Sequence, residues 1–300
     1  MVVVLPLAGV IYQFVATKID EYRYPARGEM VDVGDYSLHL YCTGKGGGAP
    51  TVVMDSGLGG TVLDWQLIQP EVAEFARVCT YDRAGMGWSE RGAQPRTSQQ
   101  FVEELHALLS NAGVEGPYVL IGHSLGGVNV QLYASHYPDE VAGMVLVDSA
   151  LSALDVLPLT ESLQPSPVSM KILATIGLTR LPYTLWGETP GNTSRNLEDE
   201  QAAITSHRKD VYEIADELAL LEESFKQQLA ASVSLGDKPL IVLTAGPLHL
   251  TGMGLSEEQL EQMDEAHTRT QAALTQGSRN AGKSSRRIAG ITSRWNSPIS

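Results

Sequence analysis

Short apolar runs alternate with amphipathic segments along most of the chain, and this pattern predicts alternating strands and helices. Two strand-like runs on either side of Gly34 and Asp35 predict an antiparallel pair. Further strands are expected at 51–57, 77–82, 117–124 and 141–149, with helices between them at 62–76, 97–113 and 128–138. This alternation is typical of an α/β domain in which helices flank a mostly parallel sheet.

The alternation stops after residue 149. Residues 150–236 have helical periodicity broken by proline and glycine, and strand character returns only at 238–246, before an acidic helix at 256–276. The pattern predicts one α/β core, formed by 29–149 and 237–276, that carries a helical insertion at 150–236. An insertion after a strand end is a natural lid over a site.

The N-terminal segment 1–17 is strongly apolar, since its first sixteen residues carry no charge. We interpret it as a membrane anchor or export segment. The segment is shorter than a spanning helix and lacks the basic start of a signal peptide, and both shortfalls are explained if its first residues are missing from this chain. The alternative is a short apolar helix packed on the domain. The first interpretation predicts a membrane-associated or exported protein, and the second a cytoplasmic one.

Charge and cysteine content narrow the functional classes. A formal net charge of −14 without a basic stripe argues against nucleic acid as a partner. Cys42 and Cys79 are too few for a disulfide framework and lack metal-ligand spacing, so we expect buried free thiols rather than a bridge.

The sequence G-H-S-L-G at 122–126 follows a buried strand and precedes a helix, which is the context of a nucleophile elbow. Gly122 and Gly126 remove side chains where a sharp strand-to-helix turn would be crowded. Ser124 is therefore the predicted nucleophile. The backbone N–H of Leu125, at a helix N-terminus, is a predicted donor to a developing oxyanion.

A second oxyanion donor is expected in the glycine-rich loop S-G-L-G-G-T, which follows the strand at 51–55. Glycines allow backbone amides to approach a substrate oxygen closely. We assign the donor to the amide of Leu58. An ordinary turn between a strand and a helix remains the alternative.

Three motifs together resemble the α/β-hydrolase superfamily: VVMDSGLGG, TYDRAGMGWS at 80–89, and VLIGHSLGG. The resemblance extends from about residue 29 to about 276. It implies an α/β-hydrolase fold with an eight-stranded, mostly parallel sheet, a Ser–acid–His triad in that chain order, and a helical lid after the sixth strand. It implies no metal and no organic cofactor. Tyr81, Asp82, Arg83 and Gly85 would then shape a loop near the pocket as structural residues.

The triad acid is expected at Asp148. Many members of the superfamily carry this acid after the seventh strand, but here that strand reads IVLTAGPLHL and ends without a carboxylate. The sixth strand ends in VLVDSA, which places Asp148 at the same sheet edge as Ser124. The alternative role for Asp148 is an N-cap of the first lid helix.

The superfamily's histidine is missing from its usual place. In the superfamily it lies in the last strand-to-helix loop, whereas the tail 277–300 contains no histidine, no recognisable final strand and no closing helix. With suitably chosen codons, a shifted reading frame of IAGITSRWNSPIS spells SGHHISVEQPDI, which resembles the missing loop. We therefore hypothesise that the tail is frameshifted or miscalled, which the gene's nucleotides would test.

Among the seven histidines present, His249 is the candidate surrogate base because it follows the seventh strand at the active-site edge. His267, on the next helix, is ranked lower. His123 adjoins Ser124 but is expected to point into the fold. The remaining four histidines, one in an early strand and three on helix-like surface segments, are expected to be structural or solvated: His39, His106, His136 and His207.

These features predict a serine hydrolase that acts on a carboxylic ester or related small acyl substrate, with activity impaired if no base is present. Serine at the elbow argues against haloalkane dehalogenase and epoxide hydrolase chemistry, for which the superfamily uses Asp. The alternative is a non-catalytic protein of the same fold that binds a small apolar ligand at a membrane surface.

Overall fold

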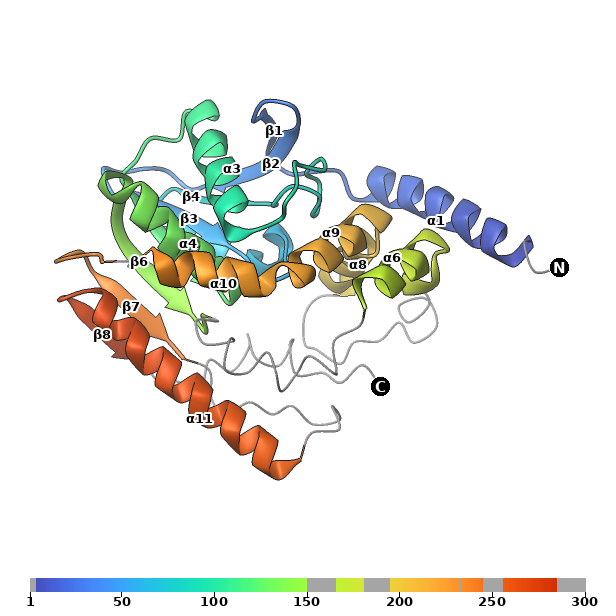
Figure 1. The fold of residues 1–300 in the computed structure, drawn as a ribbon. Helices are drawn as coiled ribbons and strands as arrows, with labels where there is room; N and C mark the ends of the chain where they lie inside the picture. The colour runs from blue at the N-terminus through green and yellow to red at the C-terminus, as the bar shows by residue number, and fades with distance from the viewer. Residues whose placement is uncertain (1–3, 150–165, 181–194, 232–233, 245–255, 285–300) are drawn as a thin grey trace.

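The computed structural model describes residues 4–149, 166–180, 195–231, 234–244 and 256–284, and Figure 1 shows how their elements are arranged. Its centre is an eight-stranded sheet in the order β1-β2-β4-β3-β5-β6-β7-β8. The pairs β1–β2 and β2–β4 are antiparallel, and the other neighbours are parallel. The predicted α/β-hydrolase fold is thereby confirmed. The strands are β1 (Glu29–Asp32), β2 (Ser37–Thr43), β3 (Thr51–Asp55), β4 (Val78–Tyr81), β5 (Tyr118–His123), β6 (Val141–Val147), β7 (Leu240–Leu243) and β8 (Ala281–Ser284).

Helices flank the sheet as the pattern predicts, with one difference. The single helix expected at 62–76 is divided, because Pro70 has no N–H to continue a helix and instead starts a new one. The flanking elements are η1 (Val62–Trp65), α2 (Gln69–Ala73), α3 (Ser98–Asn111), α4 (Leu125–His136), η2 (Pro138–Glu140), α11 (Glu257–Leu274) and η5 (Thr275–Gly277).

The central strands are buried on both faces. Successive residues of β3 point to opposite sides of the sheet, so Val53 joins the larger hydrophobic core while Val52 and Met54 join a second core with Trp65. All five residues of β3 are buried. The carboxyl ends of these rigid strands support the loops that carry the predicted site.

Strand β8 corrects one expectation. The tail was expected to lack a final strand, but Ala281–Ser284 pair in parallel with Leu240–Leu243 of β7. The polar sequence of β8 carries no strand-like apolar run, and its pairing with β7 is a long-range interaction that local pattern does not report. The sheet therefore extends beyond the core boundary predicted at residue 276. Residues 285–300, which include the segment of the frameshift hypothesis, lie outside the described residues.

The segment between β6 and β7 is helical where it is described, and Figure 1 shows its helices on one side of the molecule. Polar bonds hold it to the core, such as that from the Ser98 N–H to Ser224 Oγ at 3.0 Å. Its helices are α6 (Pro167–Thr175), η4 (Leu178–Arg180), α8 (Arg195–Thr205), α9 (Arg208–Ala219) and α10 (Leu221–Ala230).

The apolar N-terminal segment forms helix α1 (Val4–Arg23), which lies beside α6 and α8 (Figure 1). One face of α1 packs on the domain, as in the alternative interpretation of this segment, since Gln13 Nε2 donates to the Ser206 carbonyl at 3.0 Å. Within the described part of the chain, no helix is long and apolar enough to cross a membrane.

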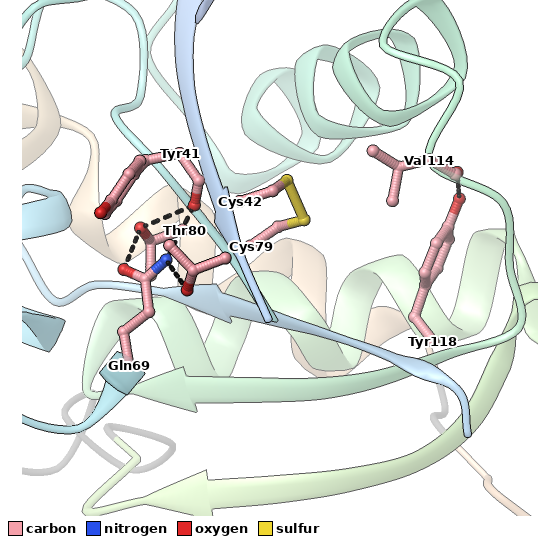
Figure 2. The surroundings of a disulfide bond; sticks show 8 residues. Tyr41, Cys42, Gln69, Cys79, Thr80, Val114 and Tyr118 are labelled. Atoms are coloured by element: carbon pink, nitrogen blue, oxygen red, sulfur yellow. Dashed lines mark hydrogen bonds between the residues drawn. A yellow bond between two sulfur atoms is a disulfide. The ribbon is translucent and has the colours of Figure 1, made fainter. Parts of the chain in front are cut away.

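The expectation of free thiols is also wrong, because Cys42 and Cys79 form a disulfide (Figure 2). The two cysteines are directly opposite in the antiparallel pair β2–β4, with Cα atoms 4.0 Å apart. Sequence reasoning missed the bridge because these strands are not consecutive in the chain. Beside it, Gln69 Nε2 donates to the Tyr41 carbonyl at 2.9 Å and Thr80 Oγ1 donates to Gln69 Oε1 at 3.0 Å (Figure 2).

Candidate active site

Ser124 lies at the sharp turn between β5 and α4, where its backbone is strained. Its φ of 50° and ψ of −117° are values that non-glycine residues rarely adopt. The turn is held by two backbone bonds, from Ser124 N–H to the Val147 carbonyl at 3.1 Å and from Gly127 N–H to the Ser124 carbonyl at 3.0 Å. This backbone is that of a nucleophile elbow.

The two motif glycines are sterically required. A Cβ on Gly122 would lie 2.4 Å from the Gly126 carbonyl oxygen, and a Cβ on Gly126 would lie 2.3 Å from the Asp55 carbonyl oxygen. Both distances are far below ordinary van der Waals contact and involve backbone atoms, which have little room to move. The predicted steric reason for G-x-S-x-G is therefore confirmed.

The glycine-rich loop 56–61 lies against the elbow. A Cβ built on Gly57 would be 3.3 Å from Ser124 Cβ, so only glycine allows this approach without displacing the serine. Leu58 and Leu125 belong to the same hydrophobic cluster. The amide of Leu58 belongs to the glycine-rich loop and that of Leu125 to the start of α4, and their oxyanion role stays a prediction.

The buried side chain of Arg83 holds the backbone of this loop. Its guanidinium donates to the carbonyls of Ser56 at 2.8 Å and Gly57 at 2.6 Å, and to Asp55 Oδ1 at 2.9 Å. Burial would lower the pKa of Arg83, but the carboxylates of Glu217 and Asp55 outweigh it and raise the pKa. This arrangement agrees with the structural role predicted for Arg83.

Glu217 of α9 is a positioning residue that the sequence did not indicate. Its carboxylate accepts from Arg83 Nε at 2.8 Å and from the Gly59 N–H at 3.1 Å. A residue of the insertion thereby holds the glycine-rich loop, about 160 positions away in sequence. Nothing local to Glu217 distinguishes it from the other acidic residues of α9, so no sequence signal was available.

Asp148 lies beside Ser124 at the ends of adjacent strands. The register of β5 and β6 pairs His123 with Val147, so the next residues, Ser124 and Asp148, continue it. Neighbouring strands are about 4.8 Å apart. Asp148 also has a positive φ of 47°, and its N–H donates to the Leu243 carbonyl at 2.8 Å.

The histidine next to Asp148 is His267 of α11. Its Nε2 lies 2.9 Å from Asp148 Oδ1, and the side chains are 18% and 25% exposed. Helix α11 is held here by Gln271 Nε2, which donates to the Ser149 carbonyl at 2.7 Å. Asp148 thus lies next to Ser124 by strand register and close to His267 through its side chain. The lower rank given to His267 on sequence rested on local position alone, while the preferred His249 lies outside the described residues.

Comparisons with known proteins support the fold. Residues 50–172 match the family model described as alpha/beta hydrolase fold. A probable hydrolytic enzyme from Pseudomonas aeruginosa PAO1 superposes with a TM-score of 0.64 at 19% identity, covering 92% of this chain and 91% of that one. The chain therefore shares the α/β-hydrolase fold.

Two curated relatives match part of this chain. An uncharacterized Bacillus subtilis protein, YqjL, is 37% identical over 107 residues, which cover 36% of this chain and 42% of that protein. The human (lyso)-N-acylphosphatidylethanolamine lipase is 35% identical over 101 residues, which cover 32% of this chain and 29% of the lipase. The match thus spans less than half the length of each relative.

The other histidines in the described part of the chain differ from His267 in their neighbours. His123 packs close to Gly57, since a Cβ there would lie 3.1 Å from its Nδ1; burial lowers its pKa, and the charge of Asp148 opposes this in part. His136 is exposed. Three others lie near carboxylates away from the elbow: His39 with Asp82 at 2.8 Å, His106 with Glu140 at 3.1 Å, and His207 with Asp20 at 3.5 Å.

Helix α9 docks on the core through buried acidic side chains. Asp210 Oδ1 accepts from the Gly87 N–H at 2.7 Å, and burial raises its pKa to about 7. Glu213 pairs with Arg96, which also binds Glu104 at 2.5 Å, and burial raises the pKa of Glu213 to about 7. These contacts place part of the insertion on the loop 83–90 next to the site.

Proposed function

We propose that this chain is a serine hydrolase that cleaves a carboxylic ester or a related acyl compound, with Ser124 as the nucleophile. The single observation that supports this most is the strained elbow at Ser124, which follows β5 next to the end of β6 that carries Asp148. Backbone strain of one residue persists only where the surrounding structure imposes it, and it is concentrated at functional sites. The lipase named above is similar to this chain over the aligned third, which favours the same broad chemistry.

The proposed reaction has two halves. The Oγ of Ser124 attacks the substrate carbonyl carbon and gives its proton to a base, while the amides of Leu58 and Leu125 bind the oxygen that becomes negative. The base returns the proton to the leaving alkoxide, and the C–O bond of the ester breaks. Water then attacks the acyl-serine in the same way, which releases the acid and restores Ser124.

His267 is the proposed proton acceptor, held by Asp148. The Asp148 carboxylate lies 2.9 Å from Nε2 of the ring, close enough to orient the imidazole in the proposed reaction. The other ring nitrogen, Nδ1, would take the Ser124 proton. This assignment moves the base from the loop after β8, where the superfamily carries it, to the helix before β8.

A second candidate function is a non-catalytic protein that binds a small apolar ligand. The observation in its favour is the tail 277–300, which contains no histidine where the superfamily has its base. In a serine hydrolase, loss of the base lowers turnover by about 10⁶ and leaves only the residual rate from oxyanion binding. The two functions therefore differ in whether Ser124 reacts.

The test is hydrolysis of p-nitrophenyl acetate by the full chain, its Ser124→Ala variant and the matched control Ser110→Ala, whose serine is exposed on α3. We expect Ser124→Ala to lower kcat/KM at least about 10³-fold and Ser110→Ala to leave it unchanged. A fluorophosphonate should label the wild type and the control but not Ser124→Ala. Equal, Ser124-independent rates and no labelling in a folded sample would favour the binding function.

A further inference from the structure

Helix α1 contacts the domain through its polar face. Gln13, Thr17 and Asp20, one helical turn apart, face inward, and Gln13 is only 3% exposed. Gly9 lies on the same side, where a Cβ would meet the Ile176 carbonyl oxygen at 2.2 Å. An ordinary surface helix does the reverse and turns its apolar stripe to the core.

Arg180 of η4 organises this polar contact. Its guanidinium donates to Gln13 Oε1 at 2.9 Å, to Asp20 Oδ2 at 2.7 Å and to Thr17 Oγ1 at 3.2 Å, and the residue is 6% exposed. Burial would raise the pKa of Asp20, but bonds from His207 and Arg180 outweigh it and lower the pKa. A buried arginine with three partners on one helix fixes how that helix is rotated, so the orientation of α1 is specified.

The opposite side of α1 exposes large apolar side chains. Leu7, Ile11 and Phe14 are 58%, 56% and 64% exposed, and they follow the i, i+4, i+7 spacing of one helical stripe. We call this stripe, together with its neighbours, the outer apolar face. Its other members are Val15 and Ile19 on α1, Val168, Ile172 and Leu173 on the adjacent α6, and Leu178 on η4.

We propose that the outer apolar face lies in the surface of a neutral lipid bilayer, with α1 parallel to the membrane plane. An in-plane helix buries its apolar side about 5–10 Å into the boundary between headgroups and acyl chains and does not cross the bilayer. The segment 4–17 has no charged residue. The first charged residues follow only in the last two turns, where Lys18 and Glu21 are joined by the strongly exposed Tyr22, a composition typical of the headgroup level.

The net charge decides between a bilayer and a second copy of the chain. Each chain carries −14 at pH 7, so two copies repel each other when they approach, and an anionic membrane also repels the chain. A neutral bilayer accepts the apolar side chains without this cost. Binding should therefore be stronger to phosphatidylcholine than to vesicles with added phosphatidylserine.

The experiment is flotation of the full chain with phosphatidylcholine vesicles. We compare the wild type with Ile11→Glu/Phe14→Glu and with the matched control Phe75→Glu, whose phenylalanine is 72% exposed after α2, outside the outer apolar face. Two carboxylates in the apolar stripe should weaken the vesicle partition coefficient at least about tenfold, while the control should bind like the wild type. Thermal unfolding checks that the wild type, the double variant and the control are all folded.

Three outcomes would overturn the proposal. The wild type can fail to float with the vesicles, or the double variant can bind as strongly as the wild type. The third is a wild type that sediments as a dimer and ignores vesicles, together with a monomeric double variant, which would assign the face to a second copy. Activity toward p-nitrophenyl acetate plays no part, so the result is independent of the proposed function.

Discussion

The nucleophile side of the candidate site and its acid–base side are held in different ways. On the nucleophile side, residues 55–60 and 122–127 are in contact through glycines, and Arg83, 2% exposed, holds the loop carbonyls from within the core. On the acid–base side, Asp148 and His267 are 25% and 18% exposed and lie between β6 and a helix near the sheet edge. The nucleophile side is buried in the core, whereas the acid–base side is partly exposed.

This difference separates stability from chemistry. A change on the nucleophile side disturbs buried backbone, so it should affect folding and activity together. A change to His267 on the acid–base side would remove the proposed proton acceptor without disturbing buried backbone, so it should affect activity more than folding. The comparison can be broken by any variant that behaves in the opposite way.

The largest effect is expected for His267→Gln. If His267 takes the Ser124 proton, its loss should lower kcat toward p-nitrophenyl acetate by at least about 10³-fold. The unfolding free energy should change by less than about 1 kcal/mol because the side chain is partly exposed. Steady-state kinetics and urea unfolding measure the two quantities.

The matched control for this variant is His136→Gln, an exposed histidine at the end of α4. Full activity of His267→Gln, with Ser124 still required, would place the base elsewhere while leaving the proposed function intact. His249→Gln would then be the next variant to measure.

The next effect concerns the disulfide between β2 and β4, which are separated from β6 and Asp148 by β3 and β5. Replacing Cys42 and Cys79 by serine opens a cross-link between residues 37 positions apart, which should lower the unfolding free energy by about 3–4 kcal/mol. Activity at a temperature where the variant is folded should be unchanged. Adding a reductant to the wild type should reproduce the loss of stability, and a count of two free thiols in the unreduced, denatured wild type would contradict the bridge.

Gly126→Ala sharpens the claim that the nucleophile side is sterically locked. The new Cβ would lie 2.3 Å from the Asp55 carbonyl oxygen, and neither backbone segment can move freely. We expect a loss of about 3 kcal/mol in unfolding free energy, measured by urea titration. Gly47→Ala is the control, because no atom lies within 4 Å of a Cβ there. Equal stability of the two variants would show that the elbow yields to a methyl group.

The same comparison explains how much the sequence could predict. The elbow and the position of Asp148 at a strand end follow from local rules: a buried strand, a glycine where a Cβ collides, a charged residue at a strand end. These rules act over a few residues, so the pattern of the chain contains them.

Long-range pairings were not predictable in this way. The Cys42–Cys79 bridge, strand β8, the ion pair of His267 with Asp148 and the bond from Glu217 to the glycine-rich loop all join residues that are distant in sequence. The docking of α1 by its polar face was missed for a related reason. A stripe of apolar residues normally predicts the buried side of a helix, and only the partner Arg180 reverses that inference.

The smallest effect is the pH dependence of how α9 is held against the nucleophile side. Burial raises the pKa of Asp210 to about 7 in the folded state, from 3.8 for an exposed carboxyl, although Lys209 and the Gly87 N–H favour its charged form. Between these two values the folded state keeps a proton that the unfolded state has lost. The contribution of Asp210 to stability is therefore complete below about pH 4, decreases as the pH rises toward 7, and is constant above it.

Asp210→Asn removes this titration but keeps an oxygen that accepts from the Gly87 N–H. Between pH 5 and 7 the wild type should lose roughly 2 kcal/mol more unfolding free energy than Asp210→Asn, as measured by urea titration at each pH. Asp139→Asn, at an exposed position, should follow the wild type. If Asp210→Asn has the same pH slope as the wild type, then α9 is held by its arginine pairs alone, and the nucleophile side gains no pH sensitivity from the insertion.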